Sequence, residues 1–400
     1  MPSHVYLDHA ATTPLDARAL DAMLPHLRGE TSNPSSLHAP GAAAREAVEE
    51  ARCAVARLIG ASPGEIIFTS GGTESDNLAV FGLAAARPEK KHVVVSAVEH
   101  PAVRNAANHL RASGYEVTTV GVDADGLVSP EQVVDALRPE TALVAVMWAN
   151  NEVGTVQPVE EIAEACRERG LPLHVDAVQA AGRVPLDVSG VPVSTLALSS
   201  HKIYGPQGVG ALYVRNGVEL RPVALGGGQE RSLRSGTENV AGIAGFGEAA
   251  RLAAEELGER TRHEEVLSNR VISGATAMPG VRLNGHRHLR LSNSAHLAVE
   301  GVEAESLVLF LDALGYAVGS GSACASHSAG HKASPVLLAM GRDDHEAFSA
   351  IRITVGKDTT EKDVDGFLDA LSTAVAQLRE LSPLGPASPA AVSGQQSALG

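Results

Sequence analysis

The 400-residue sequence has the composition of an ordinary globular protein, 44% hydrophobic, and a net charge of −15. Lysine and arginine form no run along it, so nucleic acid is not an expected partner, because phosphate binding needs a positive surface. Three cysteines are too few for a disulfide framework, no stretch approaches the length of a membrane span, and the N-terminus lacks a signal-peptide pattern. The sequence therefore predicts a cytoplasmic protein without a membrane segment.

Short apolar runs alternate with helical segments through the first 250 residues. A short strand that runs into a polar turn over 5–14 and a helix from about residue 16 come first, and helical spacing of small apolar residues follows over 41–59. The apolar runs are 66–69, 93–97, 117–120, 142–149, 173–176, 195–199 and 211–214. Strands separated by helices need crossover connections, so we expect a mostly parallel seven-stranded sheet with both faces covered.

The pattern changes after residue 247. A long helical stretch runs to about 275, strand-like alternation covers 289–297, and a helix at 304–314, a strand at 350–355 and a helix at 361–381 complete an α+β unit. The predicted division is a large domain at 16–250 and a smaller α+β domain formed by 1–15 and 251–381. The tail 382–400, rich in Pro, Ser, Ala and Gly, is expected to be disordered.

Lys202 follows the apolar run 191–198 and precedes a Gly-Pro turn. At such a strand end an amine can act as a nucleophile and form a Schiff base, although a surface lysine is the simpler interpretation of Lys202 alone. Asp176 ends the preceding strand, where it could pair with a pyridinium nitrogen, as pyridoxal phosphate (PLP) requires. Two coincident features favour a PLP site.

Polar groups also end other predicted strands. Gly71-Gly72-Thr73 joins a strand to a helix start, where free backbone N–H groups could hold a phosphate or where the motif could simply cap the helix. His100 follows the strand at 93–97, and Asn150-Asn151 follows 142–149. The fingerprints of dinucleotide-binding and Walker-type ATP sites are absent from these turns.

Cys324 stands in a Gly/Ser-rich segment, the setting in which a thiol can react rather than pack. His327 and His331 are at spacings that a metal could use, but no fourth ligand is evident, so no metal site is predicted. Cys166 lies on the apolar face of a helix at 159–169 and is expected to fill the core, whereas Cys53 lies off the apolar stripe of its helix.

Taken together, these stretches resemble the cysteine desulfurases, within the aspartate aminotransferase superfamily of PLP enzymes. The resemblance runs from Tyr6 to about Leu371. It rests on LDHAATTP at 7–14, NPSS-x-H at 33–38, SGGTESDN at 70–77, NNE-x-G at 150–154, SHK at 200–202, RSGTEN at 234–239 and GSAC at 321–324. Each motif is weak alone, but their order along the chain is specific.

The resemblance implies the PLP-dependent transferase fold and conversion of L-cysteine to L-alanine, with sulfur held on Cys324 as a persulfide. Lys202 would hold PLP and move protons at the substrate Cα, Asp176 would bond the ring nitrogen, Gln179 the ring hydroxyl, and His100 would stack on the ring and assist proton transfer. The implied cofactor-binding residues are Gly72, Thr73, His100, Asn151, Asp176, Gln179, Ser199, His201, Lys202 and Thr237, and the implied substrate-binding residues are Asn151 and Arg352.

In this family Thr237 would reach the phosphate of a second subunit, which implies a homodimer. An iron–sulfur scaffold or another sulfur-acceptor protein is the implied partner. The segment 325–333, with His327 and His331, departs from the family pattern and leaves acceptor choice, and any metal or cluster contact there, open. A selenocysteine lyase, another PLP enzyme of this superfamily and an inactive sulfur-relay or scaffold protein remain as alternatives.

Overall fold

The computed structural model describes residues 4–29, 32–320 and 333–381, so Cys324, His327, His331 and the tail at 382–400 lie outside the described residues. Its largest sheet has seven strands in the order β2-β8-β7-β6-β5-β3-β4. The strands are β2 (Ile66–Thr69), β3 (His92–Ser96), β4 (Glu116–Val120), β5 (Thr141–Ala145), β6 (Leu173–Asp176), β7 (Thr195–Ser199) and β8 (Gly210–Val214). Only β8 runs antiparallel to its neighbours, so the prediction of a mostly parallel seven-stranded sheet is confirmed.

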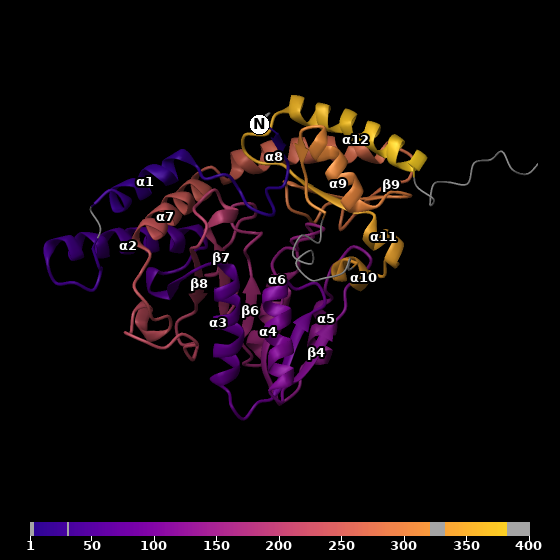
Figure 1. The fold of residues 1–400 in the computed structure, drawn as a ribbon. Coiled ribbons are helices and arrows are strands. Elements are labelled where there is room, and N and C mark those ends of the chain that lie inside the picture. Colours follow the sequence, from indigo (N-terminus) through magenta and orange to yellow (C-terminus); the bar gives the residue numbers. More distant parts are fainter. Residues whose placement is uncertain (1–3, 30–31, 321–332, 382–400) are drawn as a thin grey trace, which may run out of the picture.

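Helices cover both faces of this sheet (Figure 1). Side chains of α2 (Ala39–Leu58), α6 (Val159–Glu168) and α7 (Val240–Glu255) pack on one face, and those of α3 (Gly72–Ala85) and α4 (Pro101–Ala112) pack on the other. Cys166 is buried in the first of these cores, as predicted, and Cys53 is exposed. The helices α1 (Ala17–Leu27) and α5 (Pro130–Ala136) complete this part of the chain.

A second hydrophobic core lies around a three-stranded antiparallel sheet, β12-β10-β9, at the top of Figure 1. The strands are β9 (Val281–Asn284), β10 (Ser294–Val299) and β12 (Ala350–Thr354), and the helices are α8 (Leu257–Thr276), α9 (Ala304–Ala313), α10 (Pro335–Ala339), α11 (Asp344–Phe348) and α12 (Glu361–Leu381). The N-terminal strand β1 (Val5–Tyr6) pairs with β11 (Tyr316–Ala317), and Leu7 is buried in this core. The division into two domains stays a prediction, and residue 250 lies inside α7.

Two expected elements are wrong in detail. The long helix after 247 is two helices, which break at Glu256. The strand expected at 289–297 begins only at Ser294, because Leu289 and Leu291 bond the backbone of 154–156 instead of a sheet neighbour: Leu289 accepts from Val156 N at 2.9 Å, and Leu291 N donates to Gly154 at 2.9 Å. Among the described residues, no helix is both long and apolar enough to cross a membrane.

Candidate active site

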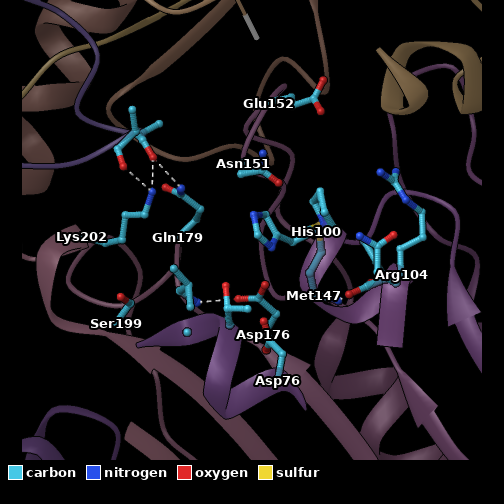
Figure 2. A pocket seen from close by; sticks show the side chains of 18 of the residues that line it. Asp76, His100, Arg104, Met147, Asn151, Glu152, Asp176, Gln179, Ser199 and Lys202 are labelled. Atoms are coloured by element: carbon cyan, nitrogen blue, oxygen red, sulfur yellow. Dashed lines mark hydrogen bonds between the residues drawn. The ribbon is translucent and has the colours of Figure 1, made fainter. Parts of the chain in front are cut away.

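A cavity of about 700 Å³ opens where the central strands of the large sheet end (Figure 2). Ten of the residues implied for cofactor and substrate line it: Gly72, Thr73, His100, Asn151, Asp176, Gln179, Ser199, His201, Lys202 and Arg352. Thr237 is not among the residues that line this cavity; it is exposed, in the segment before α7. Cys324 lies outside the described residues.

Lys202 closes a single 3-10 turn, Ser200–Lys202, that directly follows β7. Its Nζ donates to the backbone carbonyl oxygens of Ala10 and Ala11, the latter at 2.8 Å (Figure 2). The N-terminal segment therefore crosses over the lysine and forms one wall of the cavity. Gln179 points to the same place, since its Nε2 donates to the Ala10 carbonyl at 2.9 Å.

Asp176 ends β6, the neighbour of β7 in the sheet. Its Oδ1 accepts from the backbone N of Val178 at 2.9 Å, which fixes the carboxyl at the cavity floor. Burial raises the pKa of Asp176, and the nearby His100 and Lys202 oppose that shift. An acid in this position can face a protonated ring nitrogen.

His100 is the N-cap residue of α4. Its Nδ1 accepts from the backbone N of Ala102 at 3.2 Å, so the ring proton of the neutral imidazole is on Nε2. Burial lowers the pKa of His100, which favours this neutral form. A neutral ring facing the cavity can stack on a planar cofactor and can donate a hydrogen bond from Nε2.

The start of α3 offers an anion cradle. Within the described part of the chain no side chain caps this helix, whose first N–H groups have no partner within the helix, and the N-cap Gly71 has φ 152°. A Cβ on Gly72 would lie 2.7 Å from Val178 Cγ2, so glycine allows the close approach of the two segments. A second hollow of about 510 Å³ shares Gly72, Thr73, Ser199 and His201 with the cavity and extends it over these N–H groups.

These features fit PLP. A lysine amine, a buried acid and a set of free helix N–H groups with a hydroxyl beside them surround one cavity, and they match the reactive aldehyde, the ring nitrogen and the phosphate of that cofactor. Burial, with the charge of Lys202, lowers the pKa of His201 to about 4, so its ring is neutral and can bond phosphate only through a hydrogen bond.

Arg352 reaches the cavity from β12. Its Nη2 donates to Asp8 Oδ1 at 2.7 Å and its Nη1 to the Asn151 carbonyl at 2.8 Å, while its Nε is buried without a hydrogen-bond partner among the described residues. The guanidinium is therefore fixed in place, and its remaining N–H groups can bind a carboxylate. Sequence reasoning did not foresee Asp8 as its partner.

Four further charged residues line the cavity that the sequence analysis did not single out: Asp76, Glu99, Arg104 and Glu152. Glu152 is buried, and its Oε2 accepts from Ser334 Oγ at 2.5 Å. Burial raises the pKa of Glu152 to about 7, although Ser334, Arg352 and Arg104 oppose the shift. The signal in the sequence that could have found these four residues is their closeness to candidate site residues, as Glu99 is next to His100.

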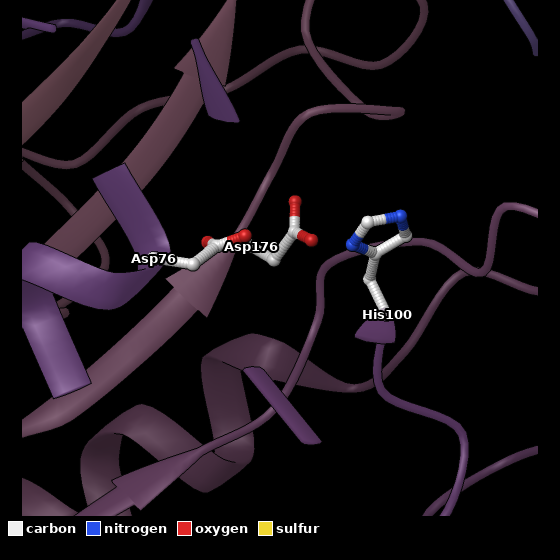
Figure 3. Close-up of side chains that lie close together, drawn as sticks. All are labelled: Asp76, His100 and Asp176. Carbon is white, nitrogen blue, oxygen red and sulfur yellow. The ribbon is translucent and has the colours of Figure 1, made fainter. Parts of the chain in front are cut away.

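The side chains of Asp76, His100 and Asp176 lie together, with Asp176 in the middle (Figure 3). One ligand atom of each lies within 4.8 Å of the others, a spacing that a metal ion could use. Asp176 is also the residue implied for the ring nitrogen, and acidic groups cluster without a metal in many proteins. We therefore assign no metal to this group.

The chain on either side of residues 321–332 is anchored beside the cavity. Gly319 and Arg352 exchange two backbone hydrogen bonds, of 3.0 and 2.8 Å. Ala333 and Pro335 line the cavity, and α10 packs through Val336 and Leu337 against Val98, Met147 and Val153. The segment that carries Cys324 thus begins and ends next to the site.

The fold and the cavity define an enzyme of the PLP-dependent transferase class. Comparisons agree: the family described as Aminotransferase class-V matches residues 5–367. Cysteine desulfurase IscS 1 of Archaeoglobus fulgidus is 44% identical over 95% of this chain and 99% of that protein, and cysteine desulfurase IscS of Neisseria gonorrhoeae is 46% identical over 95% and 94%.

Solved structures show the same likeness. A NifS-like protein superposes with a TM-score of 0.88 at 37% identity, covering 94% of this chain and 100% of the other, and a structure described as SspA in complex with cysteine gives 0.76 at 35%, covering 89% and 99%. The chain belongs to the cysteine desulfurases of the class-V aminotransferase family. It is accordingly a PLP-dependent enzyme that acts on L-cysteine.

Proposed function

We propose that Lys202, His100 and Cys324 carry out the desulfuration of L-cysteine in this chain. The observation that supports this most is the convergence of ten implied residues, from several separate elements, on one cavity of about 700 Å³. Bound PLP supplies an electron sink that makes the Cα–H and C–S bonds of the substrate labile. The chain supplies the groups that bind the substrate and move protons and sulfur.

Arg352 binds the substrate carboxylate, and Asn151 lies beside it in the cavity lining. The Lys202 amine takes the Cα proton and returns one when alanine is formed. The Cys324 thiolate attacks the substrate sulfur: the new S–S bond forms as the C–S bond breaks, so Cys324 keeps a persulfide and alanine leaves. The proton that the Cys324 thiol loses balances the one that the carbon skeleton gains as alanine forms, and His100, which lines the cavity, assists this transfer.

A homodimer is part of the proposal. Thr237 is exposed and is not among the residues that line the cavity of its own chain, an arrangement that suits a hydroxyl contributed to the phosphate of a partner subunit. The acceptor of the persulfide sulfur is an iron–sulfur scaffold or another acceptor protein in the cytoplasm. Gel filtration with calibrated scattering tests the dimer.

The test supplies L-cysteine and a reductant to the holoenzyme and measures alanine and sulfide. Lys202→Ala should lack the yellow cofactor signal and both products, and Cys324→Ser should lose sulfide formation. Cys53→Ser is the matched control, because Cys53 is exposed and does not line the cavity, and it should behave as the wild type. Wild-type sulfide formation by Cys324→Ser would contradict the persulfide step.

A further inference from the structure

Three carboxyl groups are buried together at the cavity floor: Asp76 and Glu99 are each 1% exposed and Asp176 is 5% exposed. All three line the cavity, and the charge of Asp176 acts on both of the others. Three ionised carboxylates in one buried place would repel each other and lose their hydration. The number of protons held by these three carboxyl groups therefore sets the negative charge beside the ring nitrogen of the cofactor.

The partner of Asp76 is a buried histidine of β6. His174 Nε2 lies 3.1 Å from Asp76 Oδ1, and its Nδ1 lies 3.0 Å from Thr195 Oγ1. Burial lowers the pKa of His174 to about 3, so the ring is neutral and has one N–H. The Thr195 hydroxyl can donate to Nδ1 or accept from it, so the ring proton can be on either nitrogen.

His174 is therefore a neutral neighbour of Asp76. Carboxyl oxygens of Asp76 and Asp176 lie within 4.8 Å of each other in a buried place, where two negative charges repel strongly, so one of the two groups holds a proton. Burial and the charge of Asp176 raise the pKa of Asp76 with no cation to oppose them among the described residues, whereas Lys202 opposes the rise for Asp176, so the proton belongs on Asp76. The contact between Asp76 and His174 then joins α3 to β6 without adding charge.

Of the two carboxyl oxygens of Glu99, one has hydrogen-bond partners among the described residues and the other has none. Its Oε1 accepts from Ser96 Oγ at 2.5 Å and from Met147 N at 2.7 Å, and its buried Oε2 has no hydrogen-bond partner among the described residues. A bare anionic oxygen there would lose hydration without replacement, and a proton on Oε2 removes most of that cost. Burial raises the pKa of Glu99 to about 8.

We propose that Asp76 and Glu99 are positioning residues that each hold a proton in the working enzyme, so that Asp176 is the single negative charge facing the ring nitrogen. The proposal rests on the role proposed above for Asp176. Asp76 and Glu99 then supply uncharged hydrogen-bonding groups at the cavity floor, and Asp176 alone supplies the negative charge that pairs with the cofactor.

Infrared difference spectra of the holoenzyme near neutral pH test the proton positions. Asp76→Asn and Glu99→Gln should each remove a carbonyl band of a protonated carboxyl, a band that shifts in D₂O, whereas Asp176→Asn should remove an ionised carboxylate band. Loss of a carboxylate band in Asp76→Asn would overturn the proposal for that residue. If a variant does not fold, ¹³C-aspartate or ¹³C-glutamate labelling of the unsubstituted enzyme tests the proposal by residue type: each label should shift a protonated carboxyl band, and a label that shifts none would overturn the proposal for that residue type.

The absorption of bound PLP provides a second measurement. Asn and Gln copy the neutral acids, so Asp76→Asn and Glu99→Gln should change the proton affinity of the bound cofactor by no more than about twofold, and Asp176→Asn by roughly tenfold or more. A tenfold change in Asp76→Asn would show that Asp76 is charged. If Asp176→Asn has no effect either, the assignment of Asp176 fails, and that outcome is distinct from a misplaced proton.

Discussion

Replacing Glu230 should destabilise the protein by breaking a buried ion pair. Arg52 on α2 donates from Nη1 and Nη2 to the two carboxylate oxygens of Glu230, each at 2.8 Å, and the side chains are 9% and 3% exposed. Glu230 also accepts from Phe68 N at 2.7 Å, so the pair joins α2, β2 and the turn at Glu230–Ser232. Residues 230–232 all have positive φ, which the surrounding contacts must hold.

Glu230→Ala leaves the Arg52 guanidinium buried, with the mostly exposed Glu49 as its ion-pair partner and the neutral Ile66 carbonyl as its other hydrogen-bond acceptor. Removing one partner of such a pair costs about 3–5 kcal/mol, whereas an exposed pair contributes about 1 kcal/mol or less. Glu164→Ala is the matched control, because Glu164 and Arg167 are 49% and 58% exposed. Replacing both Arg52 and Glu230 by apolar residues should cost less than Glu230→Ala alone, since no charge is then left buried.

The assay is denaturant unfolding of the holoenzyme at a fixed protein concentration, because dimerisation and cofactor binding both add to apparent stability. The unfolding free energy of Glu230→Ala should fall by several times the change in Glu164→Ala. Equal losses in the two variants would refute the reasoning from burial.

Three further predictions concern other sites. Burial raises the pKa of Glu152 from 4.5 to about 7, so the folded state binds this proton more tightly than the unfolded state does. The free energy of unfolding should therefore fall as pH rises from about 4.5 to about 7. Glu152→Gln should reduce the difference in unfolding free energy between about pH 5 and about pH 8. Gly210→Ala would place a Cβ 2.6 Å from the Leu198 carbonyl oxygen and should lower the unfolding free energy by about 1–3 kcal/mol. In a Cys324→Ser background a maleimide should label Cys53 and spare Cys166, whose thiol pKa burial raises to about 12; rapid labelling of both thiols would contradict this.

The sequence predicted the elements that depend on local pattern. Apolar runs and helical spacing located the seven strands of the large sheet within a few residues, and β6 and β7 have the bounds expected. The expected fifth strand runs beyond β5, which ends at Ala145, although Val146 and Trp148 still donate to the backbone of the β6 strand. The local pattern locates an apolar run in the sequence, but it does not show where that run stops bonding to the neighbouring strands.

Contacts between distant residues could not be predicted in this way. Asp76 and His174 are 98 residues apart and Asp8 and Arg352 are 344 apart, and each pair meets because of the strand order and the docking of the N-terminal segment. Asp76 looks like an ordinary polar residue in the first turns of a helix. Its role at the cavity floor becomes visible only when β6 is placed beneath α3.

Strand order also explains why one cofactor can touch residues from so many elements. Adjacent strands lie about 4.8 Å apart, so the carboxyl edge of seven strands spans about 29 Å, far more than a single PLP ring can contact. The sequence predicted only that Lys202, Asp176, Asn151 and His100 would lie at this edge. The observed order puts β7, β6, β5 and β3 side by side, and these are the strands that the four residues follow or end. Because β8 runs antiparallel between β7 and β2, its first residue, Gly210, pairs with Ser199 and Thr69 at this edge. A Cβ on Gly210 would lie 2.7 Å from Gly71 Cα, so a residue without a side chain is what lets the anion cradle of α3 lie this close to the end of β7.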